Sequence, residues 1–391
     1  MPSAEQDRSS DGGRLRLGVV ADPGLPSKIA EAIGAQRLEA LLPQRVTDTV
    51  QWHVQVAHEE LPLDEDGTLP LLDEAARRMP ESEWDLLVYL TDLPRALDGP
   101  PVVADLSTRN GVALISLPAI GGLRLRRHVT ETLLYLVRRM YRPEGGEQRE
   151  SARAAAAAQA VARSRRGRLL RRPGEWASPV REEHAPQADI DTSLVLIGMR
   201  GRARLLFGMV RNNRPWRLVP HLASATAAAA ATAAFGIFYS SIWNMADALA
   251  PARLALITVL AISAMVAWLL FYNHLWDPPA GSRNRQEAVL YNASTLLTLT
   301  IGVSCMYMLL YVAALGTAFV VIDSSYLSSQ LSHPADAFSY AKLVWLATSM
   351  GIVAGALGSS LDTEEAVRQA TYSARERERQ ARRRSPDKKG N

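Results

Sequence analysis

Small acidic and glycine residues follow the apolar segments of the N-terminal third of the chain, where they could bind a ligand. Asp22 and Gly24 follow the first apolar segment, and Asp92 follows a later one. Gly121 and Gly122 precede an amphipathic segment, so their backbone N–H groups could receive an anion at a helix N-terminus. Open α/β sheets bind ligands beyond the carboxyl ends of their strands, which makes these five residues the candidate ligand-binding residues. The alternative is that they are ordinary turn residues.

The motifs of common catalytic and phosphate-binding sites are missing from the sequence. No GxGxxG or GxxxxGK[ST] loop occurs, so no motif supports phosphate binding. His128 opens the segment HVTET, in which Val129 and Thr132 stand where the zinc helix HExxH has its glutamate and second histidine. His53 and His58 are five residues apart on an expected strand and point to opposite faces. We therefore expect no metal site, no bound cofactor and no complete catalytic set.

Alternating strands and helices over residues 14–145 must position these candidates. Apolar patterns predict strands at 14–21, 49–57, 85–90, 102–104 and 112–117, and helices at 27–42, 69–79 and 123–141. This order predicts an α/β domain with a mostly parallel sheet, and the direct step between the last two strands predicts a hairpin. The strand, hairpin and helix order also resembles a zincin core that has lost its metal ligands. A further strand is expected at 193–198.

Four long stretches after residue 217 carry almost no charge, and each is long enough to cross a bilayer as a helix. They run over about residues 218–245, 254–276, 288–322 and 342–361. The sequence therefore predicts an all-α transmembrane four-helix bundle over residues 218–361. The third stretch is longer than a bilayer core of about 30 Å requires. We expect it to tilt, to break near Gly302 or Gly316, or to project beyond the membrane surface.

Arginine is concentrated before the first stretch and after the fourth, and the loop between the third and fourth holds no Lys or Arg before Lys342. This alternation predicts four crossings with both termini in the cytoplasm. We expect residues 202–211 to form an interfacial helix and the surrounding residues to contact anionic lipid at the cytoplasmic face. The expected lipid-interface residues are Arg202, Arg204, Arg211, Arg214, Trp216 and Arg217. Binding of nucleic acid by these arginines is the weaker reading, because they adjoin membrane segments.

Small residues in the fourth stretch mark a close helix contact. Gly351 and Gly355 form a GxxxG motif that Gly358 continues, and this spacing lets helices approach closely. The contact could join two copies of the chain in a homo-oligomer or pack the helix inside its own bundle. Hydroxyl and amide residues of the third stretch favour packing by interhelical hydrogen bonds over a polar pathway. No charged residue falls near a membrane centre, which argues against an ion-coupled transporter.

The remaining segments are polar. Residues 1–13 lack an apolar core, so they are not a signal peptide and are expected to be disordered. Residues 146–217 read as a basic helical linker that ends in the interfacial helix. Residues 362–391 read as a charged cytoplasmic helix and tail, in which Asp362 and Glu365 have capping-box spacing. The single cysteine, Cys305, excludes a disulfide framework within one chain.

The segment GMVRNNRPWRLV at 208–219, followed by an alanine-rich span that ends in FGIFYSSIW, resembles a family of uncharacterised actinobacterial integral membrane proteins. The resemblance implies four membrane helices and a cytoplasmic α/β domain, and it implies no activity. The expected protein is a bacterial inner-membrane binding or regulatory module. The alternatives are a membrane-tethered enzyme whose active site surrounds Asp22 and Asp92, and a small-solute transporter.

Overall fold

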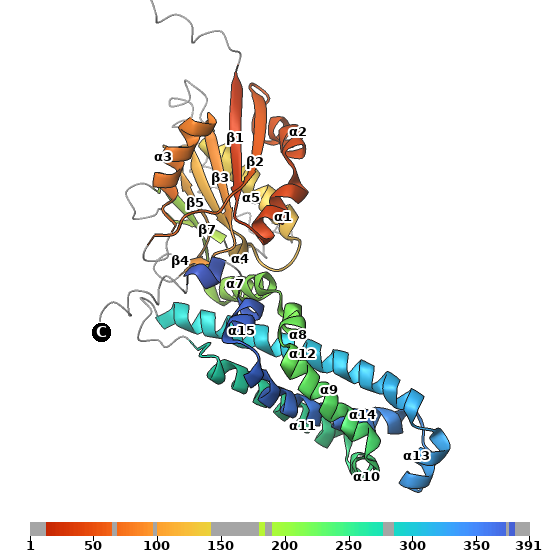
Figure 1. The fold of residues 1–391 in the computed structure, drawn as a ribbon. Coiled ribbons are helices and arrows are strands. Elements are labelled where there is room, and N and C mark those ends of the chain that lie inside the picture. The colour runs from red at the N-terminus through yellow and green to blue at the C-terminus, as the bar shows by residue number, and fades with distance from the viewer. Residues whose placement is uncertain are drawn as a thin grey trace, which may run out of the picture. The chain divides into compact units, whose positions relative to one another are not determined.

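The computed structural model describes residues 13–64, 69–96, 100–141, 180–183, 190–276, 285–372 and 375–379. The chain forms two compact units (Figure 1). The α/β unit comprises residues 1–209 and 378–391, and the helical unit comprises residues 210–377. The disorder expected before residue 13, most of the basic linker and the C-terminal tail beyond residue 379 lie outside the described residues.

One mixed sheet forms the centre of the α/β unit. Its strands are β1 (Arg14–Ala21), β2 (Gln51–His58), β3 (Leu86–Thr91), β4 (Arg95–Ala96), β5 (Pro101–Ser107), β6 (Val112–Ser116), β7 (Val180–Glu183) and β8 (Thr192–Leu196). The order is β2-β1-β3-β6-β5-β8-β7, and β4 pairs with β5. The pairs among β2, β1, β3 and β6 are parallel, and all others are antiparallel. The α/β class and the β5–β6 hairpin are confirmed, but the sheet is mixed rather than mostly parallel.

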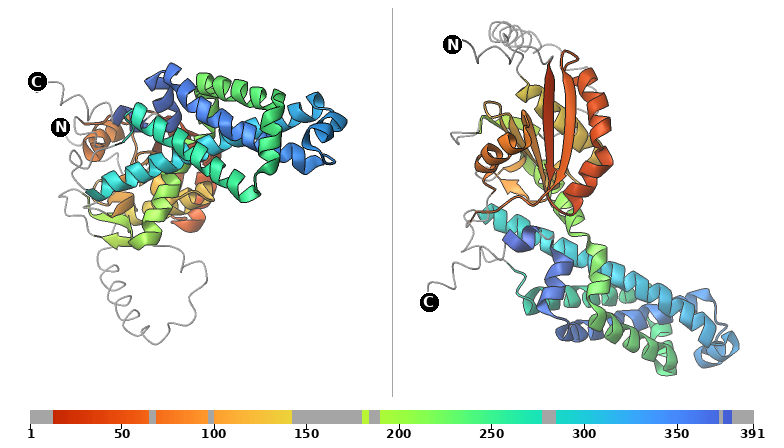
Figure 2. Two further views of the ribbon diagram at one scale, coloured as in Figure 1. Left: turned by 90° about the horizontal axis from the view of Figure 1, so that it is seen from below. Right: turned by 45° about the horizontal axis from the view of Figure 1, so that its top comes forward.

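Helices cover both faces of the parallel half of the sheet. They are α1 (Leu25–Ile33), α2 (Ala35–Arg45), α3 (Leu71–Ser82), α4 (Leu117–Ile120) and α5 (Leu125–Met140). Helix α3 lies on one face, and α1, α2 and α5 lie on the other (Figures 1 and 2). Coverage on both sides explains why β3 and β6 are continuously apolar and fully buried. Gly34, at φ 74°, divides the expected helix 27–42 into α1 and α2.

Two strands from the segment expected to be a linker complete the sheet. β8 pairs with β5, and β7 with β8, so residues 180–196 belong to the α/β unit. The expected strand at 193–198 is confirmed as β8. Helix α7 (Gly198–Asn213) follows it, and a Cβ on Gly208 would lie 1.9 Å from the Pro118 carbonyl oxygen. This close contact between α7 and α4 requires glycine. The α/β unit therefore continues to residue 209 and does not end at residue 145, where the sequence predicts a boundary.

The helical unit contains α8 (Leu218–His221), α9 (Ala223–Phe238), α10 (Ser240–Ala248), α11 (Pro251–Tyr272), α12 (Arg285–Val321), α13 (Ser324–Leu331), α14 (Ala337–Gly358) and α15 (Glu364–Thr371). Three helical stretches are long and apolar enough to cross a membrane: 251–272, 288–321 and 337–361. Residues 198–238 add a fourth if two helical stretches that meet at a 59° bend count as one span. Helix α12 is unbroken at Gly302 and Gly316.

The first apolar stretch is not the single helix that the sequence predicts. It bends at Leu222 and breaks again at Tyr239, where the backbone is extended (φ −98°, ψ 105°). The Trp243 indole Nε1–H donates to the Ile237 carbonyl at 3.0 Å, which satisfies a carbonyl at the end of α9. Trp243 is buried in the helical unit.

Asp362 supplies the cap at the other end of α9. Its two carboxylate oxygens accept hydrogen bonds from the backbone N–H groups of Ser224 (3.1 Å) and Ala225 (3.2 Å). These are orphan donors of the first helical turn. The expected capping box at Asp362 is therefore wrong, because Thr363 is the N-cap of α15 and Asp362 caps a helix 138 residues away in the sequence.

The glycines of α14 pack against α9 of the same chain. A Cβ on Gly351 would lie 2.5 Å from the Ala229 carbonyl oxygen, and one on Gly355 would lie 2.9 Å from that of Ala225. Gly358 is similarly close to Ser224 and Ala228 of α9. Close approach by small residues is the usual basis of tight helix packing in membranes. Of the two roles expected for this motif, the structure shows packing within the helical unit, and association of two copies through the fourth stretch stays a prediction.

Candidate functional site

The connections of the parallel strands diverge at the ends of β1 and β3. The chain leaves β1 through α1 and α2 on one face to reach β2, and it leaves β2 through α3 on the other face to reach β3. The chain leaves β3 through β4 and β5 toward β6, on the side of β3 that faces away from β1 and β2. The connections that leave the neighbouring strands β1 and β3 therefore diverge at the carboxyl ends of these two strands. Open α/β sheets bind ligands where neighbouring connections diverge in this way.

Asp22 stands at this divergence and joins four parts of the unit. Its backbone N–H donates to the Leu90 carbonyl of β3 at 2.9 Å, and its own carbonyl accepts from the Ser27 hydroxyl of α1 at 2.8 Å. Its Oδ1 accepts from the Leu61 backbone N–H of the segment after β2 at 3.1 Å. The side chain is fully buried. Asp22 therefore fixes the positions of α1, the end of β3 and the segment after β2 relative to the end of β1.

Gly24 begins α1 beside Asp22. Its φ of 104° lies in a region that residues with a Cβ avoid. No atom lies within 4 Å of the position that a Cβ would take, so the requirement for glycine is conformational and not one of space. The turn Asp22-Pro23-Gly24 thus changes the chain direction sharply between β1 and α1.

Asp92 lies at the end of β3, next to the end of β1. β1 and β3 are paired in register up to Ala21 and Leu90, which places Asp22 and Asp92 at the same sheet edge. Asp92 is 4% exposed. The Thr91 hydroxyl accepts from the Leu93 N–H at 3.2 Å and shapes the turn around it. The structure therefore places these two predicted residues at the same sheet edge, and their role in ligand binding stays a prediction.

Helix α7 packs against Gly121 and Gly122, the residues that the sequence suggests as an anion site, and that role stays a prediction. The Arg204 Nε–H donates to the Ile120 carbonyl at 2.8 Å, and the Arg204 side chain lies where a Cβ of Gly121 would be. A Cβ on Gly122 would lie 3.8 Å from that of Phe207. Helix α7 covers the glycine loop. The same contact corrects the expected lipid-interface role of Arg204, which is half-buried within the α/β unit.

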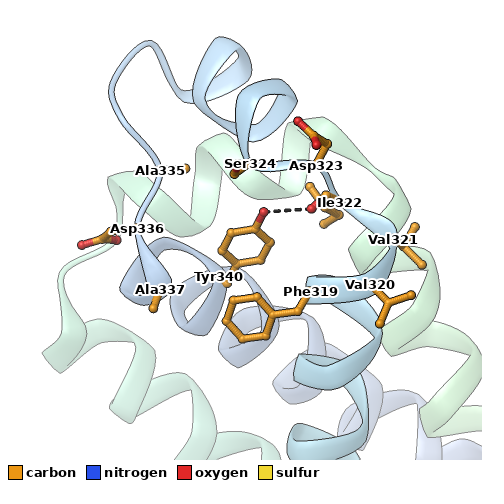
Figure 3. Close-up of a pocket in the computed structure, with 10 residues that line it drawn as sticks. All are labelled: Phe319, Val320, Val321, Ile322, Asp323, Ser324, Ala335, Asp336, Ala337 and Tyr340. Atoms are coloured by element: carbon orange, nitrogen blue, oxygen red, sulfur yellow. Dashed lines mark hydrogen bonds between the residues drawn. The ribbon is translucent and has the colours of Figure 1, made fainter.

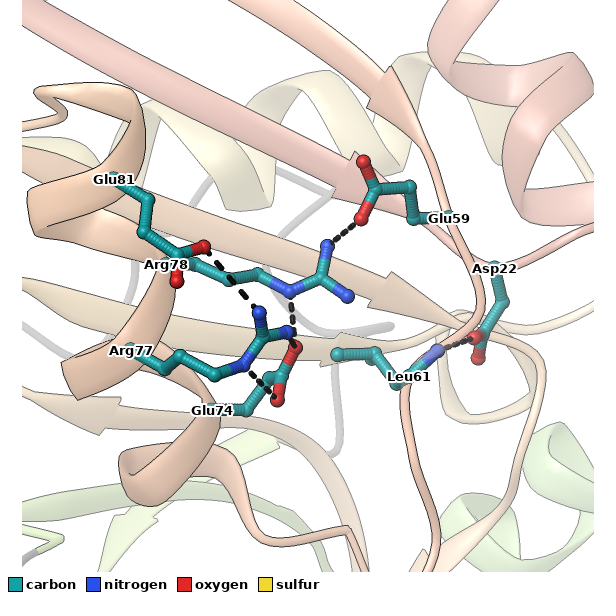
Figure 4. A network of polar contacts seen from close by, with 7 residues as sticks. All are labelled: Asp22, Glu59, Leu61, Glu74, Arg77, Arg78 and Glu81. Atoms are coloured by element: carbon teal, nitrogen blue, oxygen red, sulfur yellow. Dashed lines mark hydrogen bonds and ion pairs between the residues drawn. The ribbon is translucent and has the colours of Figure 1, made fainter.

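A charged network that the sequence analysis did not predict lies on the α3 side of the sheet, in the same region as Asp22 (Figure 4). Arg78 pairs with both Glu74 and Glu59, and Arg77 pairs with Glu74 at 2.5 Å and with Glu81 at 3.3 Å. Burial alone would raise the pKa of Glu74, but hydrogen bonds from Arg77 and Arg78 outweigh it and lower that pKa. The signal in the sequence is the four-residue spacing of Glu74 and Arg78 on one helix.

Tyr89 projects from β3 toward the same face. Burial raises the pKa of its hydroxyl, so Tyr89 is neutral. Within the described part of the chain this hydroxyl has no hydrogen-bond partner. It packs among Val20, Leu61 and Trp84, in the core beneath α3. An unpartnered buried hydroxyl needs a physical explanation, and a hydrogen bond to a bound ligand would be one.

Three of the described histidines lie beside single carboxylates in separate places. No group of three or more His, Cys, Asp or Glu side chains that could hold an ion occurs among the described residues. His128 lies on α5 with Glu131 at 3.8 Å, His53 lies beside Glu39, and His58 lies beside Glu31.

Several polar residues of the helical unit form hydrogen bonds that join its helices. The Trp345 indole donates to the Thr258 hydroxyl at 2.7 Å, and Ser349 lies 3.1 Å from both Thr258 and Tyr307. These contacts join α11, α12 and α14. Asn213 donates to Thr298 at 3.1 Å in the same manner. The bonds support the packing role expected for the polar residues of the third stretch.

A cavity of about 530 Å³ lies at the turn between α12 and α14 (Figure 3). Tyr340 and Phe319 stack within it, and the Tyr340 hydroxyl donates to the Ile322 carbonyl at 2.8 Å. Asp323 and Asp336 lie at its margin as the N-caps of α13 and α14. Hydrogen bonds from Ser325 and Ser339 hold the pKa values of these two carboxyls below the ordinary range. Both carboxylates therefore have structural roles.

Comparisons of the chain with protein-family models, with curated proteins and with solved structures find no match. The resemblance to actinobacterial membrane proteins thus rests on the residues quoted for it, and a function must be argued from the chain's own geometry.

Proposed function

We propose that this chain is a membrane-anchored binding module of the bacterial inner membrane. Its α/β unit binds a small ligand at the ends of β1 and β3, and its helical unit anchors that site to the bilayer. The observation that carries the proposal is the pair of buried carboxylate residues, Asp22 and Asp92, at the divergence of the strand connections. Buried ionisable groups at the ends of parallel strands are a common feature of functional sites.

The chemistry of the site suggests the class of ligand. An ionised carboxylate only accepts hydrogen bonds, so the ligand presents hydroxyl or amine donors to Asp22 and Asp92. Nucleosides, nucleotides and folates carry such donors beside a flat apolar ring. The turn at Gly24 adds a place where backbone can approach a ligand closely, because no side chain occupies it.

The proposed topology has four crossings. Helices α11, α12 and α14, which are long and apolar enough to cross a membrane, form three of them. The apolar stretch 218–245 forms the first in spite of its bends. The arginine distribution supports cytoplasmic termini. Arg202, Arg211, Arg214 and Arg217, together with Trp216, which is 58% exposed, contact anionic headgroups at the cytoplasmic face.

Cysteine labelling tests the orientation in intact cells. In a Cys305→Ser background, Ser329→Cys on α13 and Ala32→Cys on α1 are both exposed positions. A membrane-impermeant maleimide should label residue 329 in spheroplasts and should label residue 32 only after lysis. The opposite pattern would refute cytoplasmic termini.

Thermal shift of the purified full-length chain tests the ligand site. A ligand at 100 times its Kd should stabilise the α/β unit by about 2.7 kcal/mol. The proposal predicts a stabilising nucleotide or folate whose effect Asp92→Asn abolishes. Asp48→Asn, a change at an exposed aspartate before β2, is the control and should leave the effect intact. Conversion of the bound compound would instead support the tethered enzyme.

A further inference from the structure

Helix α7 has one buried face and one exposed apolar face. Gly201, Leu205, Gly208 and Met209 are buried on the first. Met199, Ala203 and Phe207 recur at four-residue spacing, so they form a stripe on one side of the helix. All three are exposed, with Met199 at 86% and Phe207 at 61%. An amphipathic helix that packs in a soluble domain normally exposes polar residues on this side.

The loop before α5 extends this stripe. Leu123 is 84% exposed, and the residue before it, Gly122, packs on Phe207. Leu123 therefore lies beside the exposed end of the stripe. Leu123, Met199, Ala203 and Phe207 together form a surface that we term the α7 face. Large apolar side chains grouped in this way mark a surface with a partner.

Arginines border the α7 face. Arg200 and Arg202 lie on the two sides of the Met199–Phe207 stripe, because they follow Met199 by one and three residues on the helix. Arg124 follows Leu123 directly. All three are exposed, and no acidic residue occurs in α7. Apolar side chains between arginines are the pattern of helices that lie in the interface of an anionic membrane.

Chain continuity identifies the partner. Phe207 precedes Trp216 by nine residues, and the first apolar stretch of the helical unit follows immediately. A chain anchored in a bilayer presents this surface to lipid at a high effective concentration. We propose that the α7 face docks the α/β unit on the anionic cytoplasmic leaflet. This inference rests on the membrane location in the proposed function and is independent of any ligand at Asp22 and Asp92.

A fluorescent reporter tests the docking in the full-length protein. Single cysteines at Leu123, Phe207 and the control position Ala32 are introduced in the Cys305→Ser background and labelled with an environment-sensitive dye. The labelled chains are placed in nanodiscs of phosphatidylcholine alone or with phosphatidylglycerol, and co-elution with lipid confirms insertion. A chain that does not insert would contradict the membrane location rather than the docking surface.

Emission at 123 and 207 should shift to shorter wavelength and be quenched by spin-labelled lipid in the discs that contain phosphatidylglycerol. Residue 32 should show neither effect. Arg200→Gln and Arg202→Gln should each weaken docking about fivefold, and the control Arg37→Gln should not. Equal emission at all three positions, or equal quenching with and without anionic lipid, would overturn the proposal.

Discussion

The replacement of Gly351 by alanine tests the packing of α14 on α9 directly. The new Cβ would lie 2.5 Å from the Ala229 carbonyl oxygen and 3.3 Å from the Ala233 side chain. Backbone on both sides leaves no flexible group to move, so the two helices must separate. Overpacking of this kind costs about 1–3 kcal/mol, which outweighs the gain of up to about 1 kcal/mol in helix propensity. We expect the helical unit to melt roughly 5 °C lower.

Gly316→Ala is the matched control. Gly316 also lies inside a long apolar helix, α12, and no atom lies within 4 Å of the place its Cβ would take. The same chemical change should therefore be neutral or slightly stabilising. Both variants are melted in the same detergent, and the loss of helical circular dichroism is followed. Equal melting temperatures for the two variants would refute the close α9–α14 contact.

Three further predictions concern single interactions. Asp362→Ala removes the cap of α9 and should destabilise the helical unit by about 1 kcal/mol in thermal melts, whereas Ser360→Ala, at an exposed hydroxyl that bonds within its own turn, should not. Arg95→Gln leaves the buried Asp105 carboxylate without its ion-pair partner at 3.0 Å, and it should lower the free energy of unfolding by about 3 kcal/mol in a denaturant titration. A second change in the same chain, Asp105→Asn, should recover part of this lost stability. Hydrogen bonds to the Pro334 carbonyl and to Asp247 raise the pKa of His333 above 6.5. The stabilisation that protonated His333 contributes to the folded state is therefore present below about pH 6.5, and it is lost as pH rises through the folded-state pKa. His333→Asn should remove this component of the pH dependence of melting, and an unchanged profile would exclude a role for the pair.

Local patterns were sufficient to predict much of the α/β unit. The strands at 14–21, 85–90 and 112–117 are short apolar runs bounded by turn residues, and each coincides with an observed strand to within one residue. The position of Asp22 and Asp92 followed from the same pattern, because residues after parallel strands meet at one sheet edge. β7 was missed because the sequence VREE is polar, and only its pairing with β8 makes it a strand.

The contacts that sequence analysis missed join residues far apart in the chain. Arg204 reads as a lipid-facing arginine, yet it bonds to the Ile120 carbonyl 84 residues earlier. Asp362 reads as a local helix cap, yet it caps α9. In each case the residue type suits two environments, and tertiary packing selects one.

The thermal shift of the full-length protein and of its Asp92→Asn variant tests the central claim most directly. The account predicts that at least one nucleotide or folate raises the melting temperature of the native α/β unit, and that Asp92→Asn loses this response while Asp48→Asn keeps it. A folded native protein that no such compound stabilises, or a response that survives in Asp92→Asn, would contradict a ligand site at the ends of β1 and β3.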